Sequence, residues 1–389
     1  MRAFFKAAAA ALVVVTGTWT LADPAGYHPR QEEALAATAL AEEPTTTTES
    51  PTTITIAPDS TTTTASTVPP TSAPPPTTAT TGAPTPTTTA PPGARAPVGP
   101  LPIVPPPIIP PPVRDLSAYR GLGTWVDAYD FSPQYQPNGA PAPVGPGSVD
   151  DMARVGVKTL YLQAAKDDVR SPGLLVNPEI MGPMLVRAHT LGIKVVAWYL
   201  PKFYDLDSDM ARLLAMRDFR FEGQGFDGVG LDIEWRKDVP DHTERNARLV
   251  ELSRRLRAAM GGAALSAIPP PPVIMEVVNP NYWPEFPWRE LAPLYDVWMP
   301  MAYWTFRTQS SGYRDGYRYT AENVTRLRTN LGLPQAAVHP IGGTDNRSTD
   351  EDYRGFVRAA GETGSIGGSI YDFRTTPDQA WEILRQSPR

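Results

Sequence analysis

The chain of 389 residues contains no cysteine and only four histidines. The lack of cysteine excludes disulfide bonds, thiolate catalysis and cysteine-ligated metal sites. The histidines show no ligand spacing and the carboxylates are scattered along the chain, so we expect neither a metal ion nor a cofactor. The chain also lacks a long basic block, and its formal net charge of -6 argues against nucleic acid as a partner.

The first residues predict export. Arg2 and Lys6 flank the start of an apolar stretch, residues 7–15, which is too short for a comfortable membrane span. Small residues at Thr20 and Ala22 fit a signal-peptidase site. We therefore predict a signal peptide over residues 1–22, with an uncleaved membrane anchor as the alternative. Either interpretation gives a protein that is secreted or associated with the cell surface or cell wall.

A long segment rich in threonine and proline follows. After a short stretch, residues 23–43, the chain carries runs such as Thr-Thr-Thr-Thr at 45–48 and Pro-Pro-Pro at 74–76. Such a segment buries too little apolar surface to offset its loss of conformational entropy. Residues 44–113 are therefore predicted to be a disordered, polyproline-like linker.

From residue 114 onward, strand-like and helix-like segments alternate. The expected strands are 121–127, 157–163, 194–200, 228–234, 264–268, 297–303, 337–341 and 368–372. Most are short and apolar, as parallel strands covered on both faces should be. Eight β-then-α units in fewer than about 280 residues predict a (β/α)8 TIM barrel over residues 114–389, which we expect to be a monomer.

Capping residues announce the helices between these strands. Asn177 and Pro178 open one helix, and Asp241 with Glu244 and Ser348 with Glu351 have capping-box spacing. Thr376-Pro377 opens the last helix, and the helix over 241–260 ends at a glycine pair. The fifth unit contains a proline run and then residues 273–278, which the pattern places neither in a strand nor in a loop.

One stretch concentrates acidic residues. Residues 226–235 read FDGVGLDIEW, so Val229, Leu231 and Ile233 alternate with Gly230, Asp232 and Glu234. In a strand this alternation sends the aliphatic side chains to one face and both carboxylates to the other. A buried carboxylate needs a partner or a chemical role; an ion pair with a basic residue is the structural alternative.

The active site of such a barrel lies at the carboxyl ends of its strands, so the residues that close each strand are the site candidates. The predicted catalytic residues are Glu234, Asp232, Tyr303 and Asp127, and the predicted substrate-binding residues are Trp304, Asp372, Trp125, Trp198, Tyr199, Gln163, Trp235 and Tyr371. The aromatic rings favour a sugar ligand, with Trp304 as the first candidate, although each could instead fill the core. His339 is expected to be a hydrogen-bonded strand residue, not a catalyst.

These residues carry a family resemblance. Residues 227–234, DGVGLDIE, resemble the fourth-strand signature of glycoside hydrolase family 18, the chitinase-like enzymes, whose pattern is DGxDxDxE. Met301-Ala302-Tyr303 resembles the Met-x-Tyr element of that family's sixth strand. The resemblance implies that Glu234 is the general acid and later the base, that Asp232 orients a substrate 2-acetamido group acting as internal nucleophile, and that Tyr303 hydrogen-bonds this group.

The sequence also departs from the family pattern. Gly230 replaces an inner aspartate, Trp304 replaces the acid after the tyrosine, and Asp372 stands where a tryptophan is expected. Losing the like charge at position 230 should let Asp232 ionise more readily than in the family pattern. For a substrate without an acetamido group, Asp127 or Asp372 could act as nucleophile or base across the barrel mouth.

The favoured hypothesis is an exported glycoside hydrolase that cleaves an extracellular or cell-wall polysaccharide, with N-acetylhexosamine-containing polymers favoured and Glu234 as general acid/base. The departures keep open a non-catalytic, lectin-like glycan-binding barrel and a stalked surface protein whose barrel binds another protein. A muramidase-like hydrolase of another barrel family, which would use Asp127 together with Asp232 and Glu234, is the nearest alternative enzyme.

Overall fold

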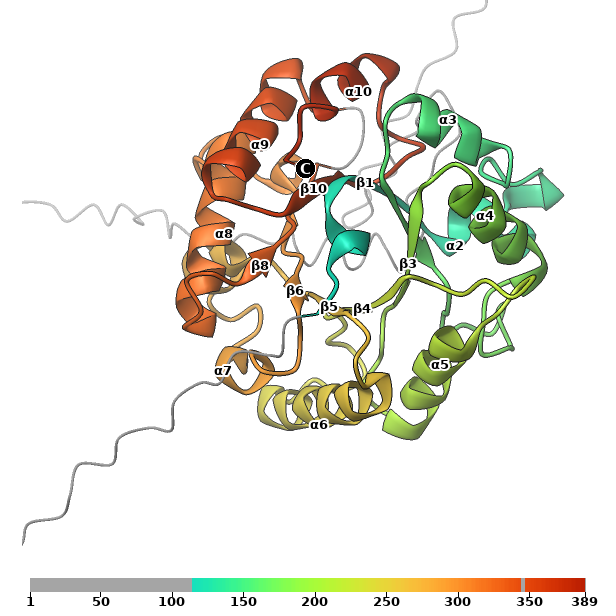
Figure 1. Cartoon of the computed structure of the whole chain (residues 1–389). Coiled ribbons are helices and arrows are strands. Elements are labelled where there is room, and N and C mark those ends of the chain that lie inside the picture. The colour runs from blue at the N-terminus through green and yellow to red at the C-terminus, as the bar shows by residue number, and fades with distance from the viewer. Residues whose placement is uncertain (1–113, 344–346, 389) are drawn as a thin grey trace, which may run out of the picture. The chain divides into compact units, whose positions relative to one another are not determined.

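The alternation of strands and helices forms a (β/α)8 barrel in the computed structural model, which describes residues 114–343 and 347–388 (Figure 1). A ring of parallel strands lies at the centre, and the helices surround it. The predicted signal peptide over 1–22, the segment 23–43 and the predicted linker over 44–113 lie outside the described residues.

Each of the eight predicted strands is present, two of them in two pieces. The strands are β1 (Gly121–Val126), β2 (Thr159–Gln163), β3 (Lys194–Tyr199), β4 (Gly228–Asp232), β5 (Leu265–Ile268), β6 (Val297–Trp298), β7 (Met301–Ala302), β8 (Ala337–Val338), β9 (Ile341–Gly342) and β10 (Gly367–Ile370). Pro300 separates β6 from β7, and Pro340 separates β8 from β9. Proline has no amide hydrogen to donate, which explains why the sixth and seventh strands are interrupted.

The strand pairing closes the ring. Strands β1 to β6 pair in sequence order, β6 pairs with β8, β7 pairs with β9, and β10 joins β9 to β1. Because β6 continues directly into β7 and β8 into β9, the two halves of the sixth and seventh strands connect the two ends of this order. The predicted barrel closure is therefore confirmed.

Helices follow the strands around the outside of the ring. They are α2 (Ala128–Phe131), α3 (Ser148–Arg154), α4 (Pro178–Thr190), α5 (Leu206–Asp218), α6 (His242–Met260), α7 (Trp288–Leu291), α8 (Gly316–Leu331), α9 (Asp350–Glu362) and α10 (Asp378–Leu384), with 3-10 turns η1 (Ser117–Tyr119), η2 (Pro133–Tyr135), η3 (Pro137–Gly139) and η5 (Trp304–Phe306). Residues 273–278, which the sequence pattern left unplaced, fall mostly within a short π-helix, η4 (Ile274–Val278).

The caps are partly as predicted. Asp241 caps α6 by accepting a hydrogen bond from the backbone N–H of Glu244. The capping box of α9 lies one residue later than predicted, because Thr349 and Asp352 form it instead of Ser348 and Glu351. No side-chain cap opens α10, which starts after Pro377.

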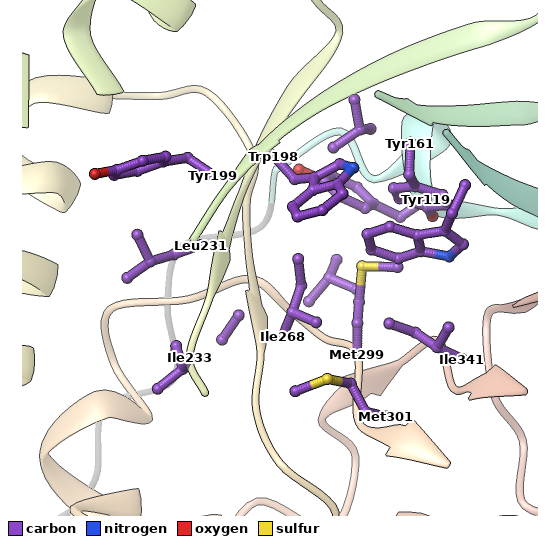
Figure 2. Packing of buried hydrophobic residues seen from close by; sticks show 14 of the residues in the cluster. Tyr119, Tyr161, Trp198, Tyr199, Leu231, Ile233, Ile268, Met299, Met301 and Ile341 are labelled. Carbon is purple, nitrogen blue, oxygen red and sulfur yellow. The ribbon is translucent and has the colours of Figure 1, made fainter. Parts of the chain in front are cut away.

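Large side chains fill the barrel interior. Tyr119 of η1 lies fully buried, and its hydroxyl donates to the backbone oxygens of Val229 at 3.2 Å and Ala264 at 3.4 Å. Figure 2 shows Trp198 and Ile268 on one side of the strands, and Tyr199 and Leu231 on the other. The interior is therefore a packed core of aromatic and aliphatic side chains, and only the ends of the strands are available for chemistry.

Across residues 114–343 and 347–388, none of the helices combines the length and the apolar character that a membrane span requires.

Candidate active site

The predicted alternation of β4 is realised in the structure. A Cβ added to Gly230 would lie 3.0 Å from Ser266 Oγ and 3.1 Å from Ile268 Cδ1, so this position faces the barrel interior. Asp232 and Glu234 follow at two-residue steps on the same face. Asp232 is 7% exposed and Glu234 is half-buried, so the pair rises from the interior toward solvent at the carboxyl end of the barrel.

Burial makes both carboxyls hold their protons more tightly than usual. Desolvation raises the pKa of Glu234 to about 7, while the positive charges of Arg236 and Lys166 act to lower it. The pKa of Asp232 is raised well above its ordinary value, first by burial and then by the neighbouring Glu234 carboxyl. The easier ionisation of Asp232 relative to the family pattern, expected from Gly230, stays a prediction. A carboxyl whose pKa lies near neutral, as that of Glu234 does, is suited to hold a proton and to release it.

Several buried polar atoms around this pair have no hydrogen-bond partner within the described part of the chain. They are Asp232 Oδ1, the Tyr282 hydroxyl and the Trp198 indole N–H. Trp198 pairs in register with Gly230, so Asp232 lies one inward-facing layer above it on the adjacent strand. Burying such a group without a partner costs about 1 to 3 kcal/mol, so each of these atoms can accept a polar partner from water or a bound molecule.

Two cations flank the acid pair. Lys166, in the segment after β2, is 8% exposed, and its ammonium lies 4.5 Å from the centroid of the Tyr129 ring. Arg236 follows Glu234 by two residues and stacks on Tyr282, in the segment after η4. Neither Arg236 nor Tyr282 was predicted as a site residue, because nothing in the sequence of the fifth unit places its insertion beside β4.

A cluster of aromatic rings extends from the barrel interior, where Trp125, Tyr161 and Trp198 are buried, to the half-buried Tyr303 and Tyr371. Trp125 stacks on Tyr161 with 4.5 Å between ring centroids, and its edge contacts Trp198 at 5.7 Å. Tyr303 and Tyr371, both half-buried, lie 5.8 Å apart. The structure therefore brings the predicted Trp125, Trp198, Tyr303 and Tyr371 together.

Trp304 and Tyr199 are corrections to the prediction. Trp304 is fully buried, packs on Tyr353 and Phe356, and donates its indole N–H to Ser348. It opens the turn η5, which carries its side chain away from the strand end and into the helix layer. Tyr199 is fully buried on the outer side of β3, where its hydroxyl donates to Asp209 at 2.6 Å. Neither ring lies where a substrate could stack on it.

Asp127 and Asp372 are both 1% exposed and already engaged. Asp127 caps α2 and accepts a hydrogen bond from the Tyr371 hydroxyl at 2.9 Å. Asp372 accepts hydrogen bonds from the backbone and hydroxyl of Thr375, and burial followed by the charge of Asp127 raises its pKa to about 6. These hydrogen bonds give both aspartates a structural role, and they argue against the expectation that either acts on substrate.

The sequence missed Asp130, which completes a group of three carboxylates. One carboxylate oxygen of each of Asp127, Asp130 and Asp372 lies within 4.8 Å of the other two. These carboxylates are scattered in the sequence, but the fold brings them together. Oxygen ligands of this kind suit a hard cation such as Ca²⁺ or Mg²⁺. The guanidinium of Arg374 lies 3.7 Å from Asp130 and supplies a competing positive charge.

The remaining predicted residues, at or near strand ends, differ in burial and in their hydrogen-bond partners. Gln163 is buried and accepts a hydrogen bond from the backbone N–H of Ala128 at 2.8 Å. Trp235 is half-buried, and its indole N–H donates to Asp238 at 2.9 Å. His339 is fully buried and its Nδ1 contacts the backbone oxygen of Tyr119 at 2.8 Å; burial lowers its pKa to about 4, consistent with a neutral strand residue.

A sugar substrate would need a hollow above Glu234, and such a hollow stays a prediction. A surface hollow of about 470 Å³ is lined by residues 285–290, Thr329 and Asn330, which lie outside the strands. At the strand ends, solvent reaches the site through the partial exposure of Glu234, Tyr303 and Tyr371.

Comparison with solved structures identifies the fold. An endo-1,4-β-D-mannanase from Thermotoga petrophila superposes with a TM-score of 0.53 at 13% identity, covering 69% of this chain and 99% of that one. The spore cortex-lytic enzyme of Bacillus cereus superposes with a TM-score of 0.51 at 10% identity, covering 71% of this chain and 76% of that one. A class V chitinase from Pseudomonas fluorescens gives 0.50 at 11% identity, covering 69% and 99%.

Sequence comparison adds nothing to this: no protein-family model and no curated protein matches the chain. At these identities the similarity concerns the fold alone. The described chain therefore has the (β/α)8 fold of these glycoside hydrolases.

Proposed function

We propose that this protein is a glycoside hydrolase in which Glu234 is the general acid and then the general base. The observation that carries the proposal is the Asp232–Glu234 pair: two carboxyls on one inward face, partly open to solvent, with both pKa values raised by burial. Glycosidic bond cleavage needs a protonated carboxyl beside a group that stabilises positive charge on the sugar. Glu234, with its raised pKa, supplies the protonated carboxyl, and Asp232 is the neighbouring group that can stabilise positive charge.

The preferred route is substrate-assisted. A 2-acetamido oxygen of the substrate attacks the anomeric carbon, the glycosidic C–O bond breaks, and Glu234 gives its proton to the departing oxygen. Water then attacks the same carbon, the bond between this carbon and the acetamido oxygen breaks, and the Glu234 carboxylate takes a proton from the water, which restores the acid. Asp232 holds the acetamido N–H and stabilises the charge that develops on this group.

The unpartnered atoms of the site support a substrate that contains an amide. Asp232 Oδ1 is a buried acceptor for an N–H group, and Tyr282 and Trp198 offer buried donors for a carbonyl oxygen. This combination favours an N-acetylhexosamine. The alternative route through Asp127 is weaker, because Asp127 would have to release the hydrogen bonds it accepts from Tyr129, Asp130 and Tyr371. The same contacts argue against the muramidase-like arrangement.

The location of the activity is also a proposal. Residues 1–22 have the pattern of a signal peptide, so the enzyme is proposed to act outside the cytoplasm on a secreted or cell-wall polysaccharide. The acidic chain and the sugar-directed site give no reason to expect nucleic acid as a partner. We propose a monomer.

A hydrolysis screen tests the proposal. The wild-type chain, Glu234→Gln and the control Glu251→Gln would be incubated with β-1,4-linked N-acetylglucosamine oligomers, peptidoglycan and mannan, with released reducing ends as the readout. Glu251 is an exposed residue in the middle of α6, outside the strands and the segments that follow them. We expect hydrolysis by the wild type and the control, and a loss of about 100-fold or more in Glu234→Gln. Full activity in Glu234→Gln would refute the mechanism, and binding without turnover in all three proteins would favour a lectin-like barrel.

A further inference from the structure

Arg236 is held in an unusual way beside the acid pair. Its guanidinium lies 4.1 Å from the centroid of the Tyr282 ring, and Nη1 donates to the Tyr282 backbone oxygen at 2.9 Å. Both contacts come from the segment after η4, the insertion of the fifth βα unit. The two interactions together fix the direction of a long side chain that would otherwise move freely.

No carboxylate of the described residues lies within ion-pair distance, 4.0 Å, of Arg236. A second cation, Arg245, lies near enough that its pKa is lowered to about 10, first by burial and then by the charge of Arg236. An arginine placed for a structural ion pair would contact a carboxylate directly, and Arg236 does not. The contacts with Tyr282 therefore fix Arg236 near the acid pair without a direct ion pair.

The carboxyl that responds to this charge is Glu234. Its charge interacts with four titratable side chains: Asp232 at the end of β4, Lys166 in the segment after β2, Arg236 in the segment after β4, and Tyr282 in the fifth unit. Burial is the largest effect on Glu234 and raises its pKa to about 7, and Arg236 is the largest opposing charge.

We propose that Arg236, clasped by Tyr282, is a positioning residue that sets how readily Glu234 gives up its proton. This inference rests on the proposed role of Glu234 as proton donor. A general acid works best when its proton affinity matches the working pH, since it must hold the proton in the resting enzyme and release it in the reaction. Desolvation alone would make the proton too hard to release, and a fixed cation two residues away offsets part of that effect.

The test is a direct titration of Glu234 in the full-length protein. The chain would be labelled with ¹³C at glutamate side chains, with Glu234→Gln identifying the resonance, and the midpoint compared among wild type, Arg236→Gln, Arg236→Met and Arg236→Lys. We expect the midpoint to rise in Arg236→Gln and Arg236→Met and to stay close to the wild type in Arg236→Lys, which keeps the charge. Tyr282→Leu should also raise it, because Arg236 loses its anchor.

Arg248→Gln is the matched control. Like Arg236, Arg248 donates to the backbone, in its case to the oxygens of Phe203 and Tyr204. Unlike Arg236, it forms an ion pair with Glu244 on α6. Its substitution should leave the Glu234 midpoint unchanged. A folded Arg236→Gln and Arg236→Met with the wild-type midpoint would overturn the inference.

Activity provides a second and separate readout. If the wild type hydrolyses N-acetylglucosamine oligomers, the alkaline limb of kcat/KM should move to higher pH in Arg236→Gln and not in Arg236→Lys. An unmoved limb in Arg236→Gln would contradict the inference. If the wild type hydrolyses nothing, the proposed function fails, while the titration still decides whether Arg236 controls the Glu234 carboxyl.

Discussion

The proposed function depends on a single residue, a carboxyl that is buried where its negative charge is unfavourable. Glu234 has a pKa of about 7 in the folded chain against an ordinary value of 4.5, because burial disfavours the ionised form. The folded state therefore binds more protons than the unfolded state between these two values, and stability falls as the pH rises through that window. The protein retains this unfavourable group, as functional sites often do.

The first prediction concerns the stability of Glu234→Gln. Glutamine resembles the protonated carboxyl, so we expect no gain in the free energy of unfolding near pH 4 and a gain of about 1 to 3 kcal/mol near pH 8. Urea unfolding at several pH values measures it, with Glu251→Gln as a control whose effect should not change with pH. A gain that is equal at all pH values would contradict the prediction.

The second prediction concerns Trp304. Its ring is fully buried against Tyr353 and Phe356, so Trp304→Ala should lower the free energy of unfolding by about 3 to 5 kcal/mol. A folded Trp304→Phe should bind oligosaccharide with unchanged affinity in calorimetry. A large loss of affinity in a stable Trp304→Phe would instead restore the original expectation that this ring contacts sugar.

The acid pair could be predicted from the sequence, and Trp304 could not, for a physical reason. Alternation along a strand assigns each side chain to a face, so Asp232, at the end of β4, could be placed on the inner face with Gly230. Glu234 follows directly after the last ladder hydrogen bond, which the Ile233 amide donates to Ile268. Beyond the last ladder hydrogen bond the alternation no longer applies. Tyr303 is still directed toward the mouth, but the turn η5 begins at Trp304 and carries the next ring away.

At the scale of elements, β4 explains one departure from the family pattern. The space that a side chain at position 230 would need is taken by Ser266 and Ile268, with Trp198 Cβ 3.6 Å away. The neighbours have thus filled the place of the missing aspartate.

The third prediction follows from this packing. Gly230→Ala should lower the free energy of unfolding by about 1 to 3 kcal/mol, and Gly230→Asp by more, since it also buries a charge. Thermal melting of both variants measures the effect. A stable Gly230→Asp with increased hydrolysis would show that the family pattern can be restored, contrary to the packing seen here.

The fourth prediction concerns the start of α9. Thr349 and Asp352 form the capping box, whereas Glu351 is exposed and lies outside it. Thr349→Ala should lower the free energy of unfolding by about 1 kcal/mol, and Glu351→Ala should change it by less than about 0.5 kcal/mol. Chemical denaturation of the two variants compares them directly, and the reverse order would support the cap predicted from sequence.

Element types were more predictable than element ends. The barrel strands were recognisable because short apolar runs alternate with capped helices. Two neighbouring residues with capping side chains, Ser348 and Thr349, each fit an acidic residue three positions later, so spacing alone could not choose between them. The fifth unit was unplaced because a π-helix has no simple hydrophobic period.

At the scale of the whole molecule, closure of the barrel concentrates chemistry at one end. Tyr119 fills the interior beneath the strands, and aromatic rings fill the middle, so polar groups without partners remain near the carboxyl ends. The residues that meet there come from β1, β3 and β4 and from the segments that follow β7 and β10. These elements are far apart in the sequence. Many of these residues could be predicted from the sequence, but that they lie close together follows only from the closed ring of strands.

The most direct test of the central claim, that Glu234 protonates the departing oxygen, compares two leaving groups. Activity on N-acetylglucosamine oligomers and on an aryl N-acetylglucosaminide would be measured for wild type and Glu234→Gln. An aryl oxide leaves with little help from an acid, so we predict a kcat/KM loss of about 100- to 10,000-fold for the oligomers and a much smaller loss for the aryl substrate. Equal losses for both substrates would contradict the account.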